Sequence, residues 1–437
     1  MKIFHKSKLL QRLTAISLGD IFCSGLGFIT TVIVSKELTV KEFGVVMLSL
    51  YIVQAAATAA CFGLDRSAVR FISYFNSKDK NDEAFGVLKT VIYMMFVSSM
   101  FFAAIVYGGE SIFGESGFSL RIKSPIPYKV LAISVFIAAI FSIVRPSLYG
   151  YKMFKASVLV QLLVDTTKLL SVSLLVILKK LNAASFFIAY AGSHLAGIIM
   201  GSLSLQRFLA QQKINPIHLS AGRVMQLISY SKWIFIGRIS DMLLSVTALS
   251  MLERLISAEA SGIYGLALSL TYIFNILINS AISTYLPEVS EFNKTYQVKE
   301  FLKYSFRISI YCGLVFIPAA FLSKYAIIFI FGTSYAASTA IFNILLLSYI
   351  PASFKLAAWL CLQSINRPEI SSIEKILSLL FMYVGCRYLI PTVGTIAPAY
   401  ITLISTAGSV VFYSIYIPRQ MSRGDSIFQN RDKRYFQ

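Results

Sequence analysis

The sequence has little charge for its length. Of its 437 residues only 14% are Asp, Glu, Lys or Arg, while 57% are hydrophobic. A soluble protein carries about 25% charged residues, so this chain has too few to cover a soluble surface. The shortage of charge excludes a soluble globular protein.

Cysteine is scarce as well, and the common catalytic motifs are missing. There is no GxxxxGK phosphate-binding loop, no His/Cys/Asp cluster with metal-ligand spacing, and no Ser/His/Asp set with a reason to meet. The sequence therefore predicts no catalytic residue, no metal site, no cofactor and no enzymatic activity. The few cysteines lie in apolar runs without paired spacing, which favours buried apolar side chains over disulfides: Cys23, Cys61, Cys312, Cys361 and Cys386.

What the chain has instead is long apolar runs. Each is about 20 residues long, the length that spans a hydrocarbon layer about 30 Å thick. The basic start, MKIFHKSKLLQRL, precedes a long run without a small-residue cleavage site, so we expect a retained first helix. We predict an all-α polytopic membrane protein with about twelve transmembrane helices, at 12–34, 43–63, 85–107, 130–150, 157–178, 184–205, 229–252, 262–285, 302–323, 337–361, 370–390 and 395–417.

The formal net charge of +20 is unevenly distributed over the predicted loops. With the N-terminus inside, cytoplasmic segments hold more Lys and Arg than outside segments, by about two to one. This bias predicts that both termini are cytoplasmic. It also explains the basic charge by contact with anionic lipid, so no nucleic-acid partner is expected.

An internal repeat divides the predicted helices into two groups. Gly44 lies 24 residues after Asp20, and Gly265 lies 24 residues after Asp241, with an aromatic residue before each glycine. The repeat places the seventh helix on the first, and two six-helix halves around a central cavity are typical of transporters. The predicted parts are an N-terminal half at 1–205, a cytoplasmic linker at 206–228, a C-terminal half at 229–417 and a basic cytoplasmic tail at 418–437.

Several predicted helices carry polar residues at three- and four-residue spacing, so that these residues share one face. Lipid disfavours such a stripe, so the pattern predicts helices around a water-filled cavity. The stripes are Ser17, Asp20, Ser24, Gly27 and Thr31; Tyr51, Gln54 and Thr58; Gln161, Asp165 and Lys168; Arg238 and Asp241; and Asn275, Asn279 and Ser283.

The same residues have structural interpretations. Small residues and Ser/Thr on a helix face are common packing surfaces. Asp165 and Lys168 would neutralise each other, and Asp20, Arg238 and Asp241 would form an ion pair that holds the halves together.

Other intramembrane polar residues have interpretations that need no ligand. Lys355 and Arg145 fit either a cavity or a helix end, and His194 fits a hydrogen-bonded interior residue. Cations near helix ends are expected to extend to the membrane surface: Lys89, Lys232, Arg307 and Lys375.

Several motifs resemble one family in order along residues 10–420. LTVKEFGVVMLSLYIV and CFGLDRSAVRFIS resemble the start of the polysaccharide-unit (Wzx-like) flippases of the multidrug/oligosaccharidyl-lipid/polysaccharide exporter superfamily. ASGIYGLALSL, YLPEVSEF and FGTSYAASTAIFNILLLSYIPA resemble its second half. The resemblance implies translocation of an undecaprenyl-diphosphate-linked oligosaccharide, an O-antigen or related repeat unit, across the bacterial inner membrane. A peptidoglycan-precursor flippase usually has two more helices.

This resemblance suggests roles for the polar stripes. Cations would bind the diphosphate through charge-assisted hydrogen bonds: Arg238, Lys168, Lys355 and Arg145. Polar neutral residues would bind sugar hydroxyls: Asn275, Asn279, Gln54, Gln161 and Tyr51. Acids would limit the affinity of the cations or carry coupled H⁺ or Na⁺: Asp20, Asp165 and Asp241. Membrane lipid, a polysaccharide polymerase and a chain-length regulator are the further candidate partners.

Three other functions are compatible with a polytopic chain. A cation-coupled multidrug exporter of the same superfamily would favour acidic or aromatic groups, whereas the intramembrane excess here is basic. A polysaccharide polymerase would need a large outside loop, and the predicted loops are short. A non-transporting scaffold leaves the polar stripes unexplained.

Overall fold

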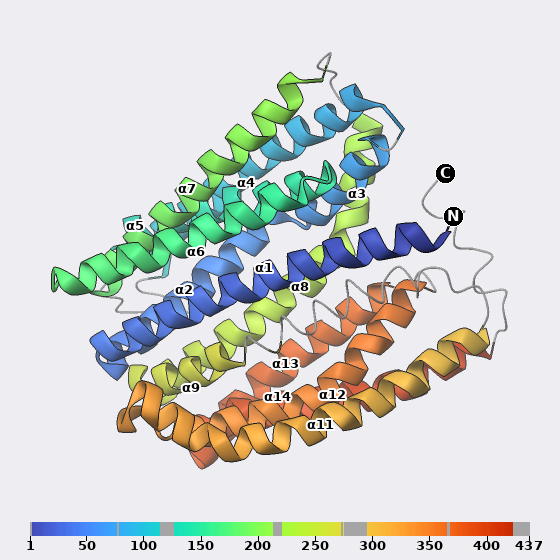
Figure 1. The fold of residues 1–437 in the computed structure, drawn as a ribbon. Helices are drawn as coiled ribbons and strands as arrows, with labels where there is room; N and C mark the ends of the chain where they lie inside the picture. Colours follow the sequence, from blue (N-terminus) through green and yellow to red (C-terminus); the bar gives the residue numbers. More distant parts are fainter. Residues whose placement is uncertain are drawn as a thin grey trace. The chain divides into compact units, whose positions relative to one another are not determined.

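The computed structural model describes residues 2–76, 78–113, 126–212, 221–271, 274, 295–364 and 368–422. These residues form helices and short connections, with no β-strand among them, so the predicted all-α class is confirmed (Figure 1). The chain forms two compact units, Met1–Val246 and Thr247–Gln437. The division lies inside a helix, and the division into six-helix halves at 205 and 229 stays a prediction.

The N-terminal unit holds seven complete helices and most of an eighth among the described residues. They are α1 (Lys2–Glu37), α2 (Val40–Cys61), α3 (Leu64–Asn76), α4 (Asn81–Phe113), α5 (Tyr128–Gly150), α6 (Phe154–Ile177), α7 (Ala183–Ala210) and α8 (Ala221–Leu255), which crosses the boundary. The C-terminal unit holds α9 (Ala258–Leu270), α11 (Thr295–Phe331), the 3₁₀ turn η1 (Thr333–Tyr335), α12 (Ser338–Ser364), α13 (Pro368–Val393), η2 (Gly394–Ile396) and α14 (Ala397–Met421).

Every predicted span coincides with a helix where the structure describes it. The span 262–285 is described only up to 271 and at 274. Among the described residues, nine helical stretches are long and apolar enough to cross a membrane, and the last, Glu369–Met421, runs through both α13 and α14. The chain is thus a multi-pass membrane protein, while the twelve crossings and the cytoplasmic termini remain predictions.

Local capping explains where two of these helices begin. Thr39 accepts a hydrogen bond from the Glu42 amide, and the Glu42 carboxylate accepts one from the Thr39 amide. Asn182 and Ser185 form the same reciprocal pair at the start of α7. Both pairs satisfy backbone donors that the first helical turn leaves free.

Helix α3 occupies a stretch that we expected to be a cytoplasmic connection. It is amphipathic: Leu64, Ala68 and Ile72 are buried, whereas Arg66 is exposed. A search for apolar runs of about 20 residues misses such a helix, because it has 13 residues and only one apolar face.

Close helix packing in the N-terminal unit depends on two glycines of α7. A Cβ atom at Gly197 would lie 2.4 Å from Val164 Cγ2, and one at Gly201 would lie 2.2 Å from Val144 Cγ1. Small residues four apart let helix backbones approach closely. Here they let α7 pack on α5 and α6 over a buried apolar cluster of Phe141, Leu148, Val160 and Val164.

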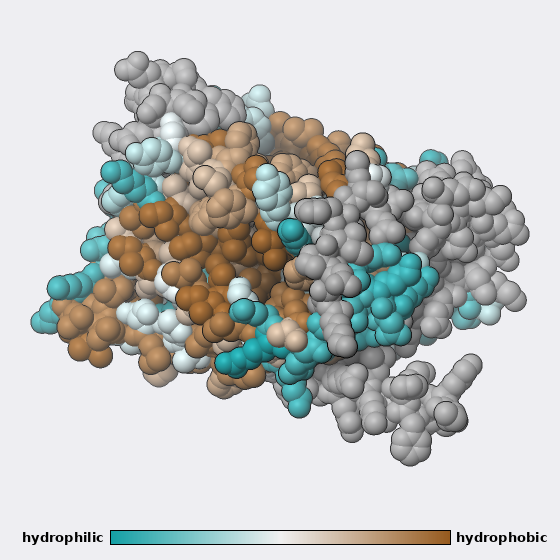
Figure 2. Space-filling model, turned by 90° about the horizontal axis from the view of Figure 1, so that it is seen from above, coloured by the Kyte–Doolittle hydropathy of each residue, from teal (hydrophilic) through white to brown (hydrophobic). Residues whose placement is uncertain are grey.

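The surface of α4 suits a hydrocarbon environment. Figure 2 shows a broad area of hydrophobic side chains bordered by hydrophilic ones on one face of the molecule. Soluble monomers rarely expose a contiguous apolar patch of more than a few hundred Å², and lipid is the environment in which this surface is stable. On α4 the exposed apolar side chains are Ile92, Tyr93, Phe96, Val97, Met100 and Phe101.

The aromatic–glycine pairs of the internal repeat are buried in both copies. Phe43 and Tyr264 are 1% and 2% exposed, and Gly44 and Gly265 beside them are buried too. The two copies differ in where the helix begins. The N-cap of α9, Ser257, lies about one turn earlier in its copy than the N-cap of α2 does.

Candidate functional site

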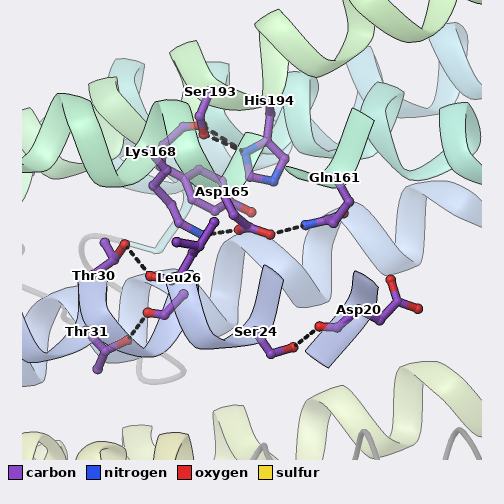
Figure 3. A network of polar contacts seen from close by, with 12 residues as sticks. Asp20, Ser24, Leu26, Thr30, Thr31, Gln161, Asp165, Lys168, Ser193 and His194 are labelled. Atoms are coloured by element: carbon purple, nitrogen blue, oxygen red, sulfur yellow. Dashed lines mark hydrogen bonds and ion pairs between the residues drawn. The ribbon is translucent and has the colours of Figure 1, made fainter. Parts of the chain in front are cut away.

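Five of the predicted site residues form one hydrogen-bonded chain across α1, α5 and α6. Arg145 Nη2 donates to Asp20 Oδ1 at 2.7 Å, and Arg145 Nη1 donates to Gln161 Oε1 at 3.3 Å. Gln161 Nε2 donates to Asp165 Oδ2 at 2.7 Å, and Lys168 Nζ donates to Asp165 Oδ1 at 2.9 Å. Figure 3 shows Gln161, Asp165 and Lys168 linked along α6, with Asp20 on α1 nearby. We refer to these five residues as the N-terminal polar network.

The geometry of α6 organises this network. Ser157, Gln161, Asp165 and Lys168 recur at steps of four, four and three residues, which places them on one face of the helix. The stripe extends over about 16 Å of helix axis at 1.5 Å per residue. Ser157 Oγ accepts a hydrogen bond from Arg145 Nε at 3.2 Å, so the guanidinium joins the stripe at its start.

The network is electrically balanced. It contains two acids and two cations, and its side chains range from 8% exposed at Asp165 and 17% at Lys168 to 23% at Arg145 and 35% at Asp20. Unpaired charge in such surroundings is costly, so each partner stabilises the other. The mutual neutralisation of Asp165 and Lys168, one of the structural interpretations of this stripe, is present in the structure.

Hydroxyl groups on α1 are engaged with their own helix. Ser24 Oγ donates to the Asp20 carbonyl oxygen at 2.8 Å, and Thr31 Oγ1 donates to the Gly27 carbonyl oxygen at 3.0 Å (Figure 3). These contacts satisfy the hydroxyl donors without a ligand. Of these α1 residues, Asp20 contributes its carboxylate to the network.

His194 lies on α7 beside aromatic rings. Its Nδ1 atom is 2.8 Å from the Tyr190 carbonyl oxygen, and its ring centroid is 4.1 Å from that of Tyr190. The geometry matches the predicted hydrogen-bonded interior residue.

Arg238 forms an ion pair with Asp65, and Asp20 pairs with Arg145. The expected ion pairing among Asp20, Arg238 and Asp241 is therefore wrong for Asp20, although Asp241 lies within electrostatic range of Arg238. Arg238 has a different partner because α3 places Asp65 beside it on α8.

Further contacts fix α3 and the end of α2 on α8. Ser67 Oγ lies within hydrogen-bond distance of the Leu227 carbonyl oxygen at 3.3 Å, and it also pairs with Ser231. The rings of Phe62 and Phe235 are 5.1 Å apart. Arg238 is therefore part of an intramolecular contact in the N-terminal unit.

Lys355 is paired within the C-terminal unit by an acid that sequence reasoning missed. Its Nζ atom lies 2.9 Å from Oε1 of Glu374, whose side chain is 6% exposed. Ser378 donates to the same oxygen at 2.9 Å, Ser409 donates to it as well, and Tyr413 donates to Oε2 at 3.2 Å. The sequence did contain a signal for this pair, because Glu374 is an acidic residue inside the predicted span 370–390.

The remaining predicted site residues fall into two groups. Tyr51 and Gln54 are half-buried on α2. Asn275 and Asn279 lie outside the described residues, so their role in sugar binding stays a prediction. No group of three or more metal-ligating side chains occurs within the described ranges.

The fold is shared with transporters of known structure. An inward-facing multidrug-resistance MATE family transporter of the MOP superfamily has a TM-score of 0.72 at 12% identity, covering 91% of this chain and 95% of its own. The lipid II flippase MurJ in an inward-closed conformation has a TM-score of 0.64 at 15% identity, covering 92% and 86%. A MOP superfamily transporter from Pyrococcus furiosus has a TM-score of 0.58 at 13% identity, covering 94% and 95%.

Comparison of the sequence with known protein families identifies one family. No curated protein matched the chain. The family described as polysaccharide biosynthesis protein matches residues 9–293, which is well over half of the sequence. Together with the all-helical membrane fold, this match shows that the chain belongs to the polysaccharide biosynthesis protein family.

Proposed function

We propose that this protein is a flippase that moves an undecaprenyl-diphosphate-linked oligosaccharide, an O-antigen or related surface-polysaccharide repeat unit. It acts in the bacterial inner membrane, from the cytoplasmic to the periplasmic face, and catalyses no covalent step. The family match supports a role in polysaccharide biosynthesis. The shared fold of MATE transporters and of the lipid II flippase supports transport by alternating access.

The observation that carries the proposal is the N-terminal polar network. Intramembrane ionisable groups are expensive and mark transport pathways, and buried ion pairs add little net stability to a fold. Here two ion pairs and an amide form one chain over three helices. A scaffold would gain as much stability from apolar packing at these positions.

Ion-pair exchange is the mechanism that this geometry supports. A diphosphate carries about two negative charges and cannot cross hydrocarbon bare. Arg145 and Lys168 already hold carboxylates, so the diphosphate binds by replacing Asp20 or Asp165 as their partner. Protonation of either acid would release its cation. The competing acids keep affinity low enough for release, and they are the candidate carriers of a coupled H⁺ or Na⁺.

The membrane potential favours the proposed direction. With the cell interior negative, an anion that moves outward gains about 2.3 kcal/mol per charge for each 100 mV. Two charges therefore supply a useful driving force even before any ion gradient contributes.

The anion-binding role is tested by charge removal in a strain that lacks the gene. We expect Lys168→Ala and Arg145→Ala to lower surface polysaccharide by on the order of tenfold or more, because charge-assisted hydrogen bonds contribute about 1.5–3 kcal/mol each. Surface polysaccharide and the lipid-linked oligosaccharide left on the inner face are both measured.

Lys180→Ala is the matched control, since Lys180 is exposed after α6 and outside the network. Membrane levels of each variant are compared by immunoblot. Wild-type export by both Lys168→Ala and Arg145→Ala would rule out cationic substrate binding by the N-terminal polar network.

The exchange mechanism makes a separate prediction for Asp20. Asp20→Asn removes the more exposed of the two competing acids. We expect tighter retention of the lipid-linked oligosaccharide and slower export, together with weaker dependence on the proton gradient in inverted vesicles. Unchanged gradient dependence would assign coupling elsewhere.

A cation-coupled multidrug exporter is the second candidate. The pairing of Arg145, Lys168, Arg238 and Lys355 with acids cancels the basic excess that argued against it. Drug susceptibility of the deletion strain separates the two functions: greater susceptibility with normal surface polysaccharide favours the exporter.

A further inference from the structure

The C-terminal unit contains a pocket whose lining includes none of the predicted site residues. It has a volume of about 360 Å³ and lies between α11, α12 and α14. Lys303, Phe306 and Arg307 line it from α11, Phe354 from α12, and Tyr413 and Ile417 from α14.

The two cations of this pocket differ from those of the transport site. Lys303 and Arg307 are one turn apart on α11, so they project from one face, and both are exposed. Among the described residues no carboxylate lies within ion-pair distance of either, although Glu300 precedes Lys303 by one turn. Within the part of the chain that the structure describes, the pocket thus presents two positive charges without an acidic partner.

Apart from Tyr413 and Ser414, the rest of the wall is apolar. Phe354 and Ile417 are 9% and 1% exposed and form a fixed surface, whereas Phe306 is 52% exposed and leaves its ring available. A free inorganic anion would use the cations and gain nothing from this surface. A ligand with both an anionic group and a hydrocarbon chain would use both.

The position of the pocket along the helices suits such an amphiphile. Lys303 and Arg307 precede the apolar part of α11, Phe316–Phe331, and Ile417 lies in the last two turns of α14. These parts correspond to one membrane surface, which the distribution of Lys and Arg predicts to be cytoplasmic.

We infer that this pocket binds a lipid phosphate, with the phosphate ester between Lys303 and Arg307 and the hydrocarbon chain on Phe306, Phe354 and Ile417. The site is distinct from the N-terminal polar network and does not depend on the proposed function. Tyr413 connects the pocket to the transport-site candidates, because its hydroxyl donates to Glu374, the partner of Lys355. A ligand in the pocket would therefore contact Tyr413, which is hydrogen-bonded to the buried Lys355–Glu374 ion pair.

The test is native mass spectrometry of the full chain in detergent with added lipid. We expect phosphatidylglycerol to bind, phosphatidylcholine to bind more weakly, and Lys303→Ala/Arg307→Ala to weaken phosphatidylglycerol binding by on the order of tenfold or more. Lys299→Ala/Lys324→Ala is the matched control, since it removes two exposed cations of the same helix outside the pocket.

Two further probes identify the source of the phosphate and the role of the apolar wall. Undecaprenyl phosphate replacing phosphatidylglycerol from the protein would make a polyprenyl lipid the preferred occupant, and the reverse would make it a membrane phospholipid. Ser414→Trp fills the pocket from α14 while keeping both cations, and it should abolish lipid adducts but leave weak inorganic pyrophosphate binding unchanged.

The inference is overturned if Lys303→Ala/Arg307→Ala and the control variant lose lipid equally, or if Ser414→Trp binds lipid as the wild type does. Thermal melting of each variant shows whether it is folded. The exposed position of Lys303, Arg307 and Ser414 makes loss of folding unexpected.

Discussion

Arg145 donates hydrogen bonds to four side chains, those of Asp20, Tyr149, Ser157 and Gln161. A planar guanidinium with five N–H groups can satisfy such a set, whereas a lysine ammonium has three donors on a flexible stem. At the scale of the residue, each charge of the site has a partner of opposite charge. Removing one charged residue therefore leaves its partner buried without a counter-charge, which costs free energy.

Lys168 and Asp165 allow this cost to be measured. We expect Lys168→Gln to lower the thermal midpoint, because it leaves the Asp165 carboxylate, 8% exposed, without its cation. Breaking a buried pair costs about 3–5 kcal/mol, and partial exposure of Lys168 reduces this value. Thermal unfolding in detergent is the measurement.

Asp165→Asn/Lys168→Gln is the control for that variant. It removes both charges and should recover most of the lost stability. A double variant as unstable as Lys168→Gln would mean that the pair is not the source of the effect. Export by the double variant then reports the functional role separately.

At the scale of the element, the packing of α7 depends on glycines, which leave room for the side chains of neighbouring helices. Gly197 and Gly201 let α7 lie against Val164 and Val144. Because α6 carries Gln161, Asp165 and Lys168, the position of α7 behind it supports the network. Helix α3 has a comparable role for α8, since it supplies Asp65 to Arg238.

Gly197→Leu should disrupt the packing of α7. An added Cβ already lies 2.4 Å from Val164 Cγ2, and overpacking a filled interior costs about 1–3 kcal/mol. We expect a lower thermal midpoint and reduced membrane levels.

Gly192→Leu is the control on the same helix, because a Cβ at Gly192 meets nothing within 4 Å. It has the same change in helix propensity and hydrophobicity. Equal destabilisation by both variants would show that helix propensity, and not contact with α6, explains the result.

At the scale of the whole molecule, the chain must be threaded through the bilayer in a defined direction. The distribution of Lys and Arg predicts cytoplasmic termini. It therefore predicts that the α5–α6 connection is inside and the α6–α7 connection is outside. Lys155 and Lys180 are exposed at these two ends of α6.

Cysteine labelling in intact cells tests this orientation. A membrane-impermeant maleimide should label Lys180→Cys before lysis and Lys155→Cys only after lysis. The wild-type chain is the background control, since the four cysteines whose side chains are described, Cys23, Cys61, Cys361 and Cys386, are buried. The opposite pattern would invert the predicted topology.

Much of the architecture could be predicted from local patterns. A run of about 20 apolar residues becomes a helix in a membrane, because its backbone polar groups have no other way to be satisfied. Twelve predicted spans therefore coincide with helices where the structure describes them. The polar face of α6 followed from three- and four-residue spacing in the same way.

The sequence by itself determined the membrane class, the positions of the long apolar helices and the residues of the N-terminal polar network. Only the tertiary structure decided which charge meets which: Asp20 with Arg145 across 125 residues, Arg238 with Asp65 across 173, and Lys355 with Glu374 across 19. The apolar runs and the helical spacing are local in the chain, whereas ion pairs between helices depend on how the helices pack. For the same reason, the sequence alone indicated only a cation near a helix end at Arg307, and the apolar wall that α12 and α14 place beside Arg307 and Lys303 depends on helix packing.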